Sequence, residues 1–433
     1  MLETLKNAWR VKEIRQKILF TFLIILIFRI GSYIPVPYID LARVKELMQA
    51  SYTDGGFFSY LGILTGGAME YGALFAMSVT PYINSSIIMQ LLTVAIPPLE
   101  RLAREGEEGQ KKIAKYTRYA TVILGLIQGA AYWYWLQASS CISATSTFDK
   151  VFAAIVIILC FTAGSAMMMW LGERIDEKGI GNGISILLFA GIISRVPQGA
   201  ATLWGYFGQG DAAGIGTGIM ILLILLVVIV FIVWMQGAER RIPIQYAKRV
   251  VGRKQYGGQN THMPIKVNMS GVMPIIFASS ILTIPTQILA FMGSNPNTDG
   301  LWYKTLSLFS YRTWFYAVIY FAMIIAFGFF YMTIQYNPLE MANNLRKNGG
   351  LIPGIRSGKA TQDYLSRILR RITLIGCIFL GAIAVLPIVV GQISNVNLSL
   401  GGTSMLIVVG VAIDTVQQLE SQMMMRHYKG FLD

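Results

Sequence analysis

The stretch IGTGIMILLILLVVIVFIVWM, residues Ile215–Met235, runs for 21 residues without a charged side chain. A helix rises about 1.5 Å per residue, so this stretch can cross the roughly 30 Å hydrocarbon core of a bilayer. Apolar stretches of this kind recur along the 433 residues, of which 54% are hydrophobic and 13% charged. Soluble domains carry about 25% charged residues. The sequence therefore predicts an all-α, polytopic membrane protein.

Ten stretches are candidates for membrane spans, seven of them clear and three weak. The clear stretches, which lack charged residues, are Tyr71–Ile96, Tyr119–Ala138, Val151–Leu171, Ile215–Met235, Gly271–Met292, Trp314–Ile334 and Ile372–Val390. The weak stretches, each short or interrupted, are Ile18–Ile34 with Arg29, Ile184–Leu203 with Arg195 and Pro197, and Ser404–Glu420 with Asp414. The charges between the stretches decide whether the weak ones are spans.

Positive charges are concentrated in alternate connecting segments. The net charge is +14, and with ten spans 29 of the 36 Lys and Arg fall on the side of both chain ends, against six on the other side. Cytoplasmic segments of membrane proteins carry an excess of Lys and Arg. Leaving out a weak central span would move the basic segment Arg240–Lys266 to the other face. We therefore expect ten spans, with both termini in the cytoplasm.

Residues that would support catalysis or metal binding are scarce. The cysteines Cys141, Cys160 and Cys377 form no CxxC pair, and His262 and His427 have no cluster of ligands around them, so we expect no metal site and no disulfide framework. We find no catalytic residues, no nucleotide-binding motif and no sign of a cofactor. Ionisable residues within the spans are few, which argues against an ion-coupled transporter.

Ten spans divide into two sets of five, residues 1–205 and residues 206–433. The second span contains Pro81–Ile87 (PYINSSI) and the seventh contains Pro274–Ile281 (PIIFASSI), which share Pro, then Ile two residues on, then Ser-Ser-Ile. An odd number of spans per half would make such a repeat inverted. The match is short and one residue out of register, so chance explains it equally well. The polar residues in both spans suit helix packing or a wall that can part.

A glycine-rich stretch precedes the second span. Residues Phe57–Met69 are moderately apolar but too broken to cross a membrane. Irregular backbone at membrane depth persists only where it is buried in protein or lines a cavity. The stretch is either a re-entrant segment that plugs a pore or an ordinary external loop, and hydropathy favours neither.

Two long basic segments lie on the predicted cytoplasmic side. Gly237–Ser270 has Glu239 as its only acidic residue, and it is longer than the setting of topology requires. Gln335–Arg371 is of similar length and contains Pro353–Arg356, a turn that presents one arginine. We expect these segments to bind acidic protein surfaces or the phosphates of ribosomal RNA.

Five ordered sets of motifs resemble those of the SecY family. They are Phe28–Gly31 with Ile34–Pro37, Thr80–Ile83 with Gln90–Leu92, Leu171–Ser185 (LGERIDEKGIGNGIS), Val267–Pro274 and Gly401–Ser404. The matches extend over the whole chain in the order typical of the family. The resemblance implies two inverted halves of five helices, arranged as a clamshell around an hourglass-shaped pore.

The resemblance also implies roles for individual residues. The waist of the pore would be an aliphatic ring of Ile83, Ile87, Leu188, Ile192, Ile276 and Ile407. Just outside it would lie the plug segment, Tyr60, Leu61, Gly62, Ile63, Leu64, Thr65, Gly66, Gly67, Ala68 and Met69. A lateral gate between the second and seventh spans would include Ser86, Gln90, Ser279, Ser280 and Thr283. Binding of a motor or ribosome would use Arg240, Arg241, Lys248, Arg249, Arg253, Lys254 and Arg356.

The function implied is passage of unfolded secretory polypeptides across the cytoplasmic membrane, with lateral release of transmembrane segments into it. The implied partners are the subunits SecE and SecG, the motor ATPase SecA, the ribosome with its RNA and proteins, preproteins with signal sequences, and anionic membrane lipids. No catalytic activity is expected of this chain. The alternative from the architecture alone is a secondary transporter built from inverted repeats.

Overall fold

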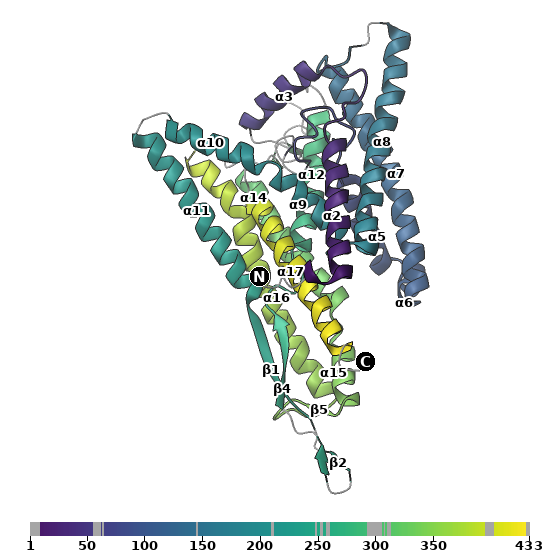
Figure 1. Cartoon of the computed structure of the whole chain (residues 1–433), viewed down its shortest axis with the longest axis vertical. Coiled ribbons are helices and arrows are strands. Elements are labelled where there is room, and N and C mark those ends of the chain that lie inside the picture. The colour runs from purple at the N-terminus through teal and green to yellow at the C-terminus, as the bar shows by residue number, and fades with distance from the viewer. Residues whose placement is uncertain are drawn as a thin grey trace.

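The computed structural model describes residues 9–54, 62, 65–143, 146–208, 212–246, 249–251, 254–256, 260–291, 305–306, 308–309, 313–394 and 402–429. Long helices form the body of the molecule, and a slender ribbon of β-strands projects from one end of it (Figure 1). This arrangement confirms the predicted all-α membrane protein and adds a β-extension that the hydropathy pattern did not predict.

A helix corresponds to each of the ten predicted spans. In chain order they are α2 (Lys12–Gly31), α5 (Thr80–Ala95), α7 (Glu107–Ala138), α8 (Thr147–Lys178), α9 (Gly183–Ile193) with α10 (Val196–Gly208), α11 (Ala212–Gly237), α12 (Met273–Phe291), α14 (Trp314–Gln335), α16 (Lys359–Ser394) and α17 (Gly402–Lys429). Shorter helices are α3 (Leu41–Asp54), α6 (Pro97–Arg104) and α15 (Pro338–Lys347).

By length and apolar composition alone, five helices within the described residues qualify as membrane spans. They are Phe148–Lys178, Gly183–Gly205, Gly218–Gly237, Trp314–Lys347 and Lys359–Val390, and the bent pair Thr80–Ala95 with Pro97–Arg104 would be a sixth. Other helices that we predicted as spans are less apolar or shorter. Helix α2 carries Arg15, Lys17 and Arg29, for example, and the apolar helix Met273–Ile288 is short.

The second predicted span, Tyr71–Ile96, is helical only from Thr80 onward. Residues 65–79 fold into consecutive turns instead, with one isolated bridge to Pro35 at Ala73. Pro81 lies in the first turn of α5, where its missing N–H leaves no helical hydrogen bond unmade. At the far end, the chain bends by 101° between α5 and α6. The prediction of one continuous span was therefore wrong in extent, because apolar composition does not separate a helix from buried turns.

The core joins helices from both predicted halves. Helix α7 packs against α5 and α8, and α14 packs against α12 and α16. Contacts between α5 and α12 and between α9 and α17 connect segments that lie far apart in the sequence. The division at residues 205 and 206 stays a prediction, and that point lies near the end of α10.

The predicted loop Gly237–Ser270 contains a β-ribbon. Strand β1 (Glu239–Tyr246) pairs antiparallel with β4 (Asn260–Lys266), and β5 (Gly350–Leu351) pairs with the other edge of β1. The short strands β2 (Arg249–Val251) and β3 (Lys254–Tyr256) form a separate hairpin. Ile242 and Ile244 are buried while their neighbours in β1 are exposed, which is the period of a strand with one packed face.

The buried face of the ribbon is held by the helices beside it. Ile242, Ile244 and Ile265 form one hydrophobic cluster with Leu345 of α15 and Leu365 of α16. The ribbon is therefore packed against the helical body at its base, and two of the predicted cytoplasmic segments form one structural unit.

The start of α2, the end of α17 and the base of the ribbon lie at the same face. The Nζ atom of Lys17 donates to Oε1 of Gln422 at 3.2 Å, and Lys266 at the end of β4 bonds to Gln417. The cluster of Ile14, Ile180 and Leu419 links α2 and α17 to the junction after α8. The start of α2 and the end of α17 therefore lie beside the base of the ribbon, and the cytoplasmic position of this face stays a prediction.

Candidate functional site

The six residues of the predicted aliphatic ring come from four helices and are all buried. Ile83 and Ile87 lie on α5, Leu188 and Ile192 on α9, Ile276 on α12 and Ile407 on α17. All six belong to one hydrophobic cluster. The cluster also contains residues of α2, α8, α11, α14 and α16, so the six lie in one apolar core that joins positions 83 to 407 of the sequence.

The predicted lateral-gate residues lie on α5 and α12, which are in contact. On α12, the hydroxyl of Ser279 donates to the carbonyl of Ile276 at 3.0 Å, and that of Thr283 donates to Ser280 at 2.7 Å. The amide oxygen Oε1 of Gln90 is buried without a hydrogen-bond partner among the described residues. A buried polar atom without a hydrogen-bond partner lowers the stability of the folded state by about 1–3 kcal/mol. Polar atoms thus accumulate at this seam inside an otherwise apolar body. Ser86 lies half-buried on the same helix as Gln90.

The plug segment is described in part, and Tyr60, Leu61, Ile63 and Leu64 lie outside the described residues. Gly62 and residues 65–69 are buried. Gly66 and Gly67 have positive φ angles of 62° and 89°, which glycine adopts without steric cost. A Cβ atom on Gly66 would also collide with the side chain of Ser194. Gly62 and residues 65–69, the described part of the segment, therefore form buried backbone.

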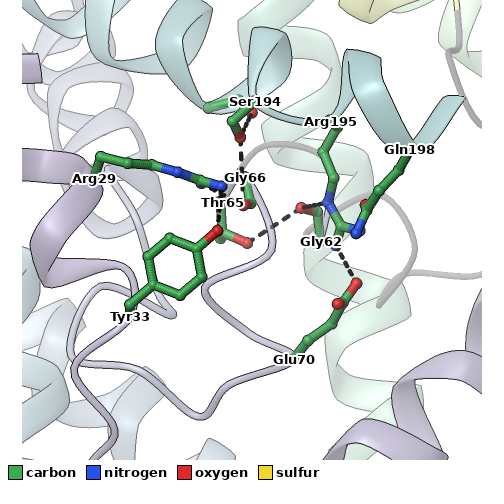
Figure 2. Close-up of polar contacts among 10 residues, drawn as sticks. Arg29, Tyr33, Gly62, Thr65, Gly66, Glu70, Ser194, Arg195 and Gln198 are labelled. Carbon is green, nitrogen blue, oxygen red and sulfur yellow. Dashed lines mark hydrogen bonds and ion pairs between the residues drawn. The ribbon is translucent and has the colours of Figure 1, made fainter. Parts of the chain in front are cut away.

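Two arginines reach into this turn, one from α2 and one from the break between α9 and α10 (Figure 2). Nη1 of Arg29 on α2 donates to the carbonyl of Gly66 at 2.9 Å. Nε of Arg195, in the break between α9 and α10, donates to the carbonyl of Gly62 at 3.3 Å. The same guanidinium forms an ion pair with Glu70, immediately after the plug segment.

From the sequence, Arg29 and Arg195 stand out as interruptions of weak spans, and Glu70 was missed as a site residue. A signal was present, because Glu70 is the only charged residue between Asp54 and Glu100. A lone carboxylate within an apolar region needs a partner if it is to stay ionised. Arg195 supplies that partner from a position 125 residues further along the chain.

The motif Leu171–Ser185 forms the junction between α8 and α9. The backbone N–H of Gly183 donates to Oδ1 of Asp176 at 2.7 Å, and Asn182 caps α9 by accepting from the N–H of Ser185 at 3.1 Å. Glu173 accepts from Nε of Arg118 on α7 at 2.8 Å. The motif therefore fixes the position and direction of α9 relative to α8. Helix α9 carries two of the predicted ring residues.

The predicted partner-binding residues lie on the ribbon and on a turn beside it. Arg240 and Arg241 are exposed on β1, and Arg241 pairs with Glu239 at 2.7 Å. Arg356 is exposed on a turn that is fixed by the hydroxyl of Thr361, which donates to the carbonyl of Arg356 at 2.8 Å. Arg249 lies in β2 and Lys254 in β3, whereas Lys248 and Arg253 lie outside the described residues.

Within the described part of the chain, no group of three or more His, Cys, Asp or Glu residues is placed to hold a metal ion. Cys141, Cys160 and Cys377 are free thiols. The arrangement of buried aliphatic residues, a buried turn and exposed basic segments suits conduction and docking.

Comparison with solved structures defines the class of protein. The chain resembles a solved protein-conducting channel over 94% of its own length and 92% of that chain, with a TM-score of 0.65 and 19% identity. It also resembles Sec61 in the canine ribosome–channel complex from the endoplasmic reticulum, with a TM-score of 0.59, 17% identity and coverage of 94% and 92%. The fold is that of the solved protein-conducting channels.

Comparison with relatives identifies the family. The SecY family model matches residues 73–416. The chain is 44% identical to the protein translocase subunit SecY of Thermotoga maritima, covering 100% of this chain and 98% of the relative. It is 43% identical to that of Bacillus subtilis over the full length of both. The chain belongs to the SecY family. It is a multi-pass membrane subunit of a protein-translocation channel, and neither an enzyme nor the secondary transporter of the alternative hypothesis.

Proposed function

We propose that this chain forms the path by which unfolded secretory polypeptides cross the cytoplasmic membrane, and that it releases transmembrane segments sideways into the lipid. The observation that carries the proposal is that six aliphatic side chains from α5, α9, α12 and α17 are all buried within one hydrophobic cluster. An apolar constriction resists the passage of ions without using charge, because water leaves a narrow hydrophobic pore. A polypeptide that is driven from one side can part such a ring.

The lateral gate is the seam between α5 and α12. A signal sequence that enters this seam would meet lipid on one side and the polar residues Gln90, Ser279 and Thr283 on the other. The buried, unpartnered oxygen of Gln90 supports this role, since a polar group on an arriving segment would satisfy it. Ser86 and Ser280 complete the gate.

The ribbon and the Arg356 turn are the docking surface for partners. The base of the ribbon lies beside the start of α2 and the end of α17, and the excess of Lys and Arg in these segments supports a cytoplasmic position for this face. We assign the motor ATPase SecA and the ribosome to this surface, where basic side chains meet acidic protein surfaces or RNA phosphates. SecE and SecG would complete the membrane complex. Anionic lipids would bind the basic side chains close to the membrane surface.

Energy for transport would come from these partners. The experiment reconstitutes the chain with its partner subunits in liposomes, adds the motor ATPase and a radiolabelled precursor, and measures the precursor protected from external protease. ATP-dependent protection is expected. Uptake of a small solute without any protection of the precursor would contradict the proposal.

A further inference from the structure

The geometry points to a latch in the idle channel: we propose that the Glu70–Arg195 ion pair, assisted by Arg29, holds the described part of the plug segment, Gly62 and residues 65–69, closed against the end of α9. The inference rests on the proposed function and deepens it, because it names the bonds that must break before a polypeptide passes. Figure 2 shows the side chains of Arg29, Ser194 and Arg195 pointing toward the short stretch of backbone between Gly62 and Glu70.

The ion pair lies in a site that excludes most water. The side chain of Arg195 is 12% exposed and that of Glu70 is 8% exposed. Removal of one partner from such a pair leaves an uncompensated buried charge, which costs far more than the loss of an exposed pair. The closed position of the plug segment is therefore the arrangement in which both charges are satisfied.

The latch also holds the backbone of the plug segment itself. Arg195 donates to the carbonyl of Gly62 while it pairs with Glu70, so one guanidinium bonds at both ends of the described part of the turn. Between these points, the carbonyl of Gly66 accepts from Nη1 of Arg29 at 2.9 Å and from the hydroxyl of Ser194 at 3.4 Å. Arginine suits this task because its planar fork presents several donors at once.

The position of Arg195 connects the latch to the ring. Arg195 directly follows α9, the helix that carries the ring residues Leu188 and Ile192. Its own N–H donates to the carbonyl of Ile192 at 3.0 Å. A movement of α9 that widens the ring would therefore carry Arg195 away from Glu70 and Gly62. Opening of the ring and release of the plug segment become one event.

Arg29 provides the second point of attachment, from α2. Its Nη2 donates to the hydroxyl of Tyr33 at 2.7 Å, and its guanidinium lies 4.7 Å from the centre of the same ring. Tyr33 thereby orients the arginine toward Gly66. Because α2 and α9 approach the turn separately, displacement of either helix removes one set of bonds.

The test measures potassium efflux from liposomes that contain the purified complex in the absence of precursor. Glu70→Gln and Arg195→Gln are each expected to raise idle efflux about tenfold, equivalent to about 1.4 kcal/mol lost from the closed state. The exchange variant Glu70→Arg/Arg195→Glu keeps both charges but loses the bond from Arg195 to the carbonyl of Gly62, so it is expected to leak less than either single variant without reaching the parental seal. Glu107→Gln, which removes an exposed ion pair with Lys111, is the matched control and should not leak.

Parental efflux in a correctly assembled Glu70→Gln complex would overturn the latch. An exchange variant that leaks as much as the single variants would also overturn the ion pair as the latch, because the bond from Arg195 to Gly62 or the packing at those positions would then hold the segment. If the single variants fail to assemble, the exchange variant decides alone. Precursor protection measured in the same vesicles separates the two proposals: a parental complex that protects no precursor contradicts the channel function, whereas normal protection with unchanged idle efflux contradicts only the latch.

Discussion

A methyl group on Gly183 would overlap the carbonyl oxygen of Gly172, so the start of α9 lies against α8 at a separation that only glycine allows. Gly183 also donates its N–H to Asp176 at 2.7 Å. These contacts give a physical reason for the residues in the motif Leu171–Ser185. The motif is a close helix junction, and it positions Leu188 and Ile192 one and two turns further along α9.

Gly183→Ala should therefore destabilise the junction. The added methyl group meets backbone, which cannot move aside as a flexible side chain would, and overpacking of this kind costs about 1–3 kcal/mol. We expect a lower unfolding temperature of the detergent-solubilised complex. Gly216→Ala on α11 is the control, because a Cβ there meets open space and alanine favours the helix. Equal unfolding temperatures for the two variants would contradict the close junction.

Ile87→Asn should raise ion leak through the idle channel and relax the selection of signal sequences. Ile87 is 2% exposed within the ring cluster, whereas its neighbour Ile88 is 43% exposed on the same helix. An amide placed in the constriction would hold water there and lower the barrier to ions. Planar-bilayer conductance compares Ile87→Asn with Ile88→Asn. If Ile88→Asn conducts more than Ile87→Asn, or if neither variant conducts more than the parent, the ring lies elsewhere. Ile407→Asn is expected to behave like Ile87→Asn.

Arg356→Glu should impair transport that is driven by the motor while it leaves the idle seal intact. The side chain is exposed on a turn fixed by Thr361 and makes none of the bonds that hold the plug segment. Reversal of one charge at a docking surface weakens association with an acidic partner and makes it less sensitive to salt. Lys359→Glu reverses an exposed charge three residues away and is the control. If both variants transport equally well, Arg356 has no special part in docking.

Cys141 should make the protein less stable at high pH. Burial, and then the nearby carboxylate of Asp40, raise the pKa of the Cys141 thiol, while Arg43 acts in the opposite direction. The folded state therefore favours the neutral thiol, and this contribution to stability is complete below the unfolded pKa of about 8.5 and is lost as pH rises through the folded pKa. The parent should lose more stability than Cys141→Ala between about pH 8 and about pH 10. If the stability of the parent and of Cys141→Ala falls equally over this pH range, the pKa of the Cys141 thiol is not raised in the folded protein.

The number and order of the spans could be predicted from the sequence because they depend on two local properties. Apolar length decides where a helix crosses the bilayer, and the placement of Lys and Arg decides on which side each connection lies. The weak spans Ile18–Ile34 and Ser404–Glu420 show that these properties work together. Each is interrupted by a charge, yet each corresponds to a helix, α2 and α17.

The latch and the ribbon could not be predicted in the same way. The Glu70–Arg195 pair joins residues that no periodic pattern connects, and the turns at residues 65–79 have the apolar composition of a helix. In the ribbon, the alternation of Ile242 and Ile244 extends over too few residues to stand out among basic neighbours. Both features depend on tertiary contacts, which fix the backbone where local propensity leaves it open.

The central claim is that Ile83, Ile276 and Ile407 line one path. The most direct measurement places a photocrosslinking amino acid at each of these positions and follows translocation of a precursor that is arrested by a folded domain at its end. We predict that all three positions crosslink to the same segment in the middle of the precursor, because the three helices that carry them surround it together. Crosslinks only to lipid, or only to other helices of the complex, would show that these residues are ordinary packing and would contradict the assigned path.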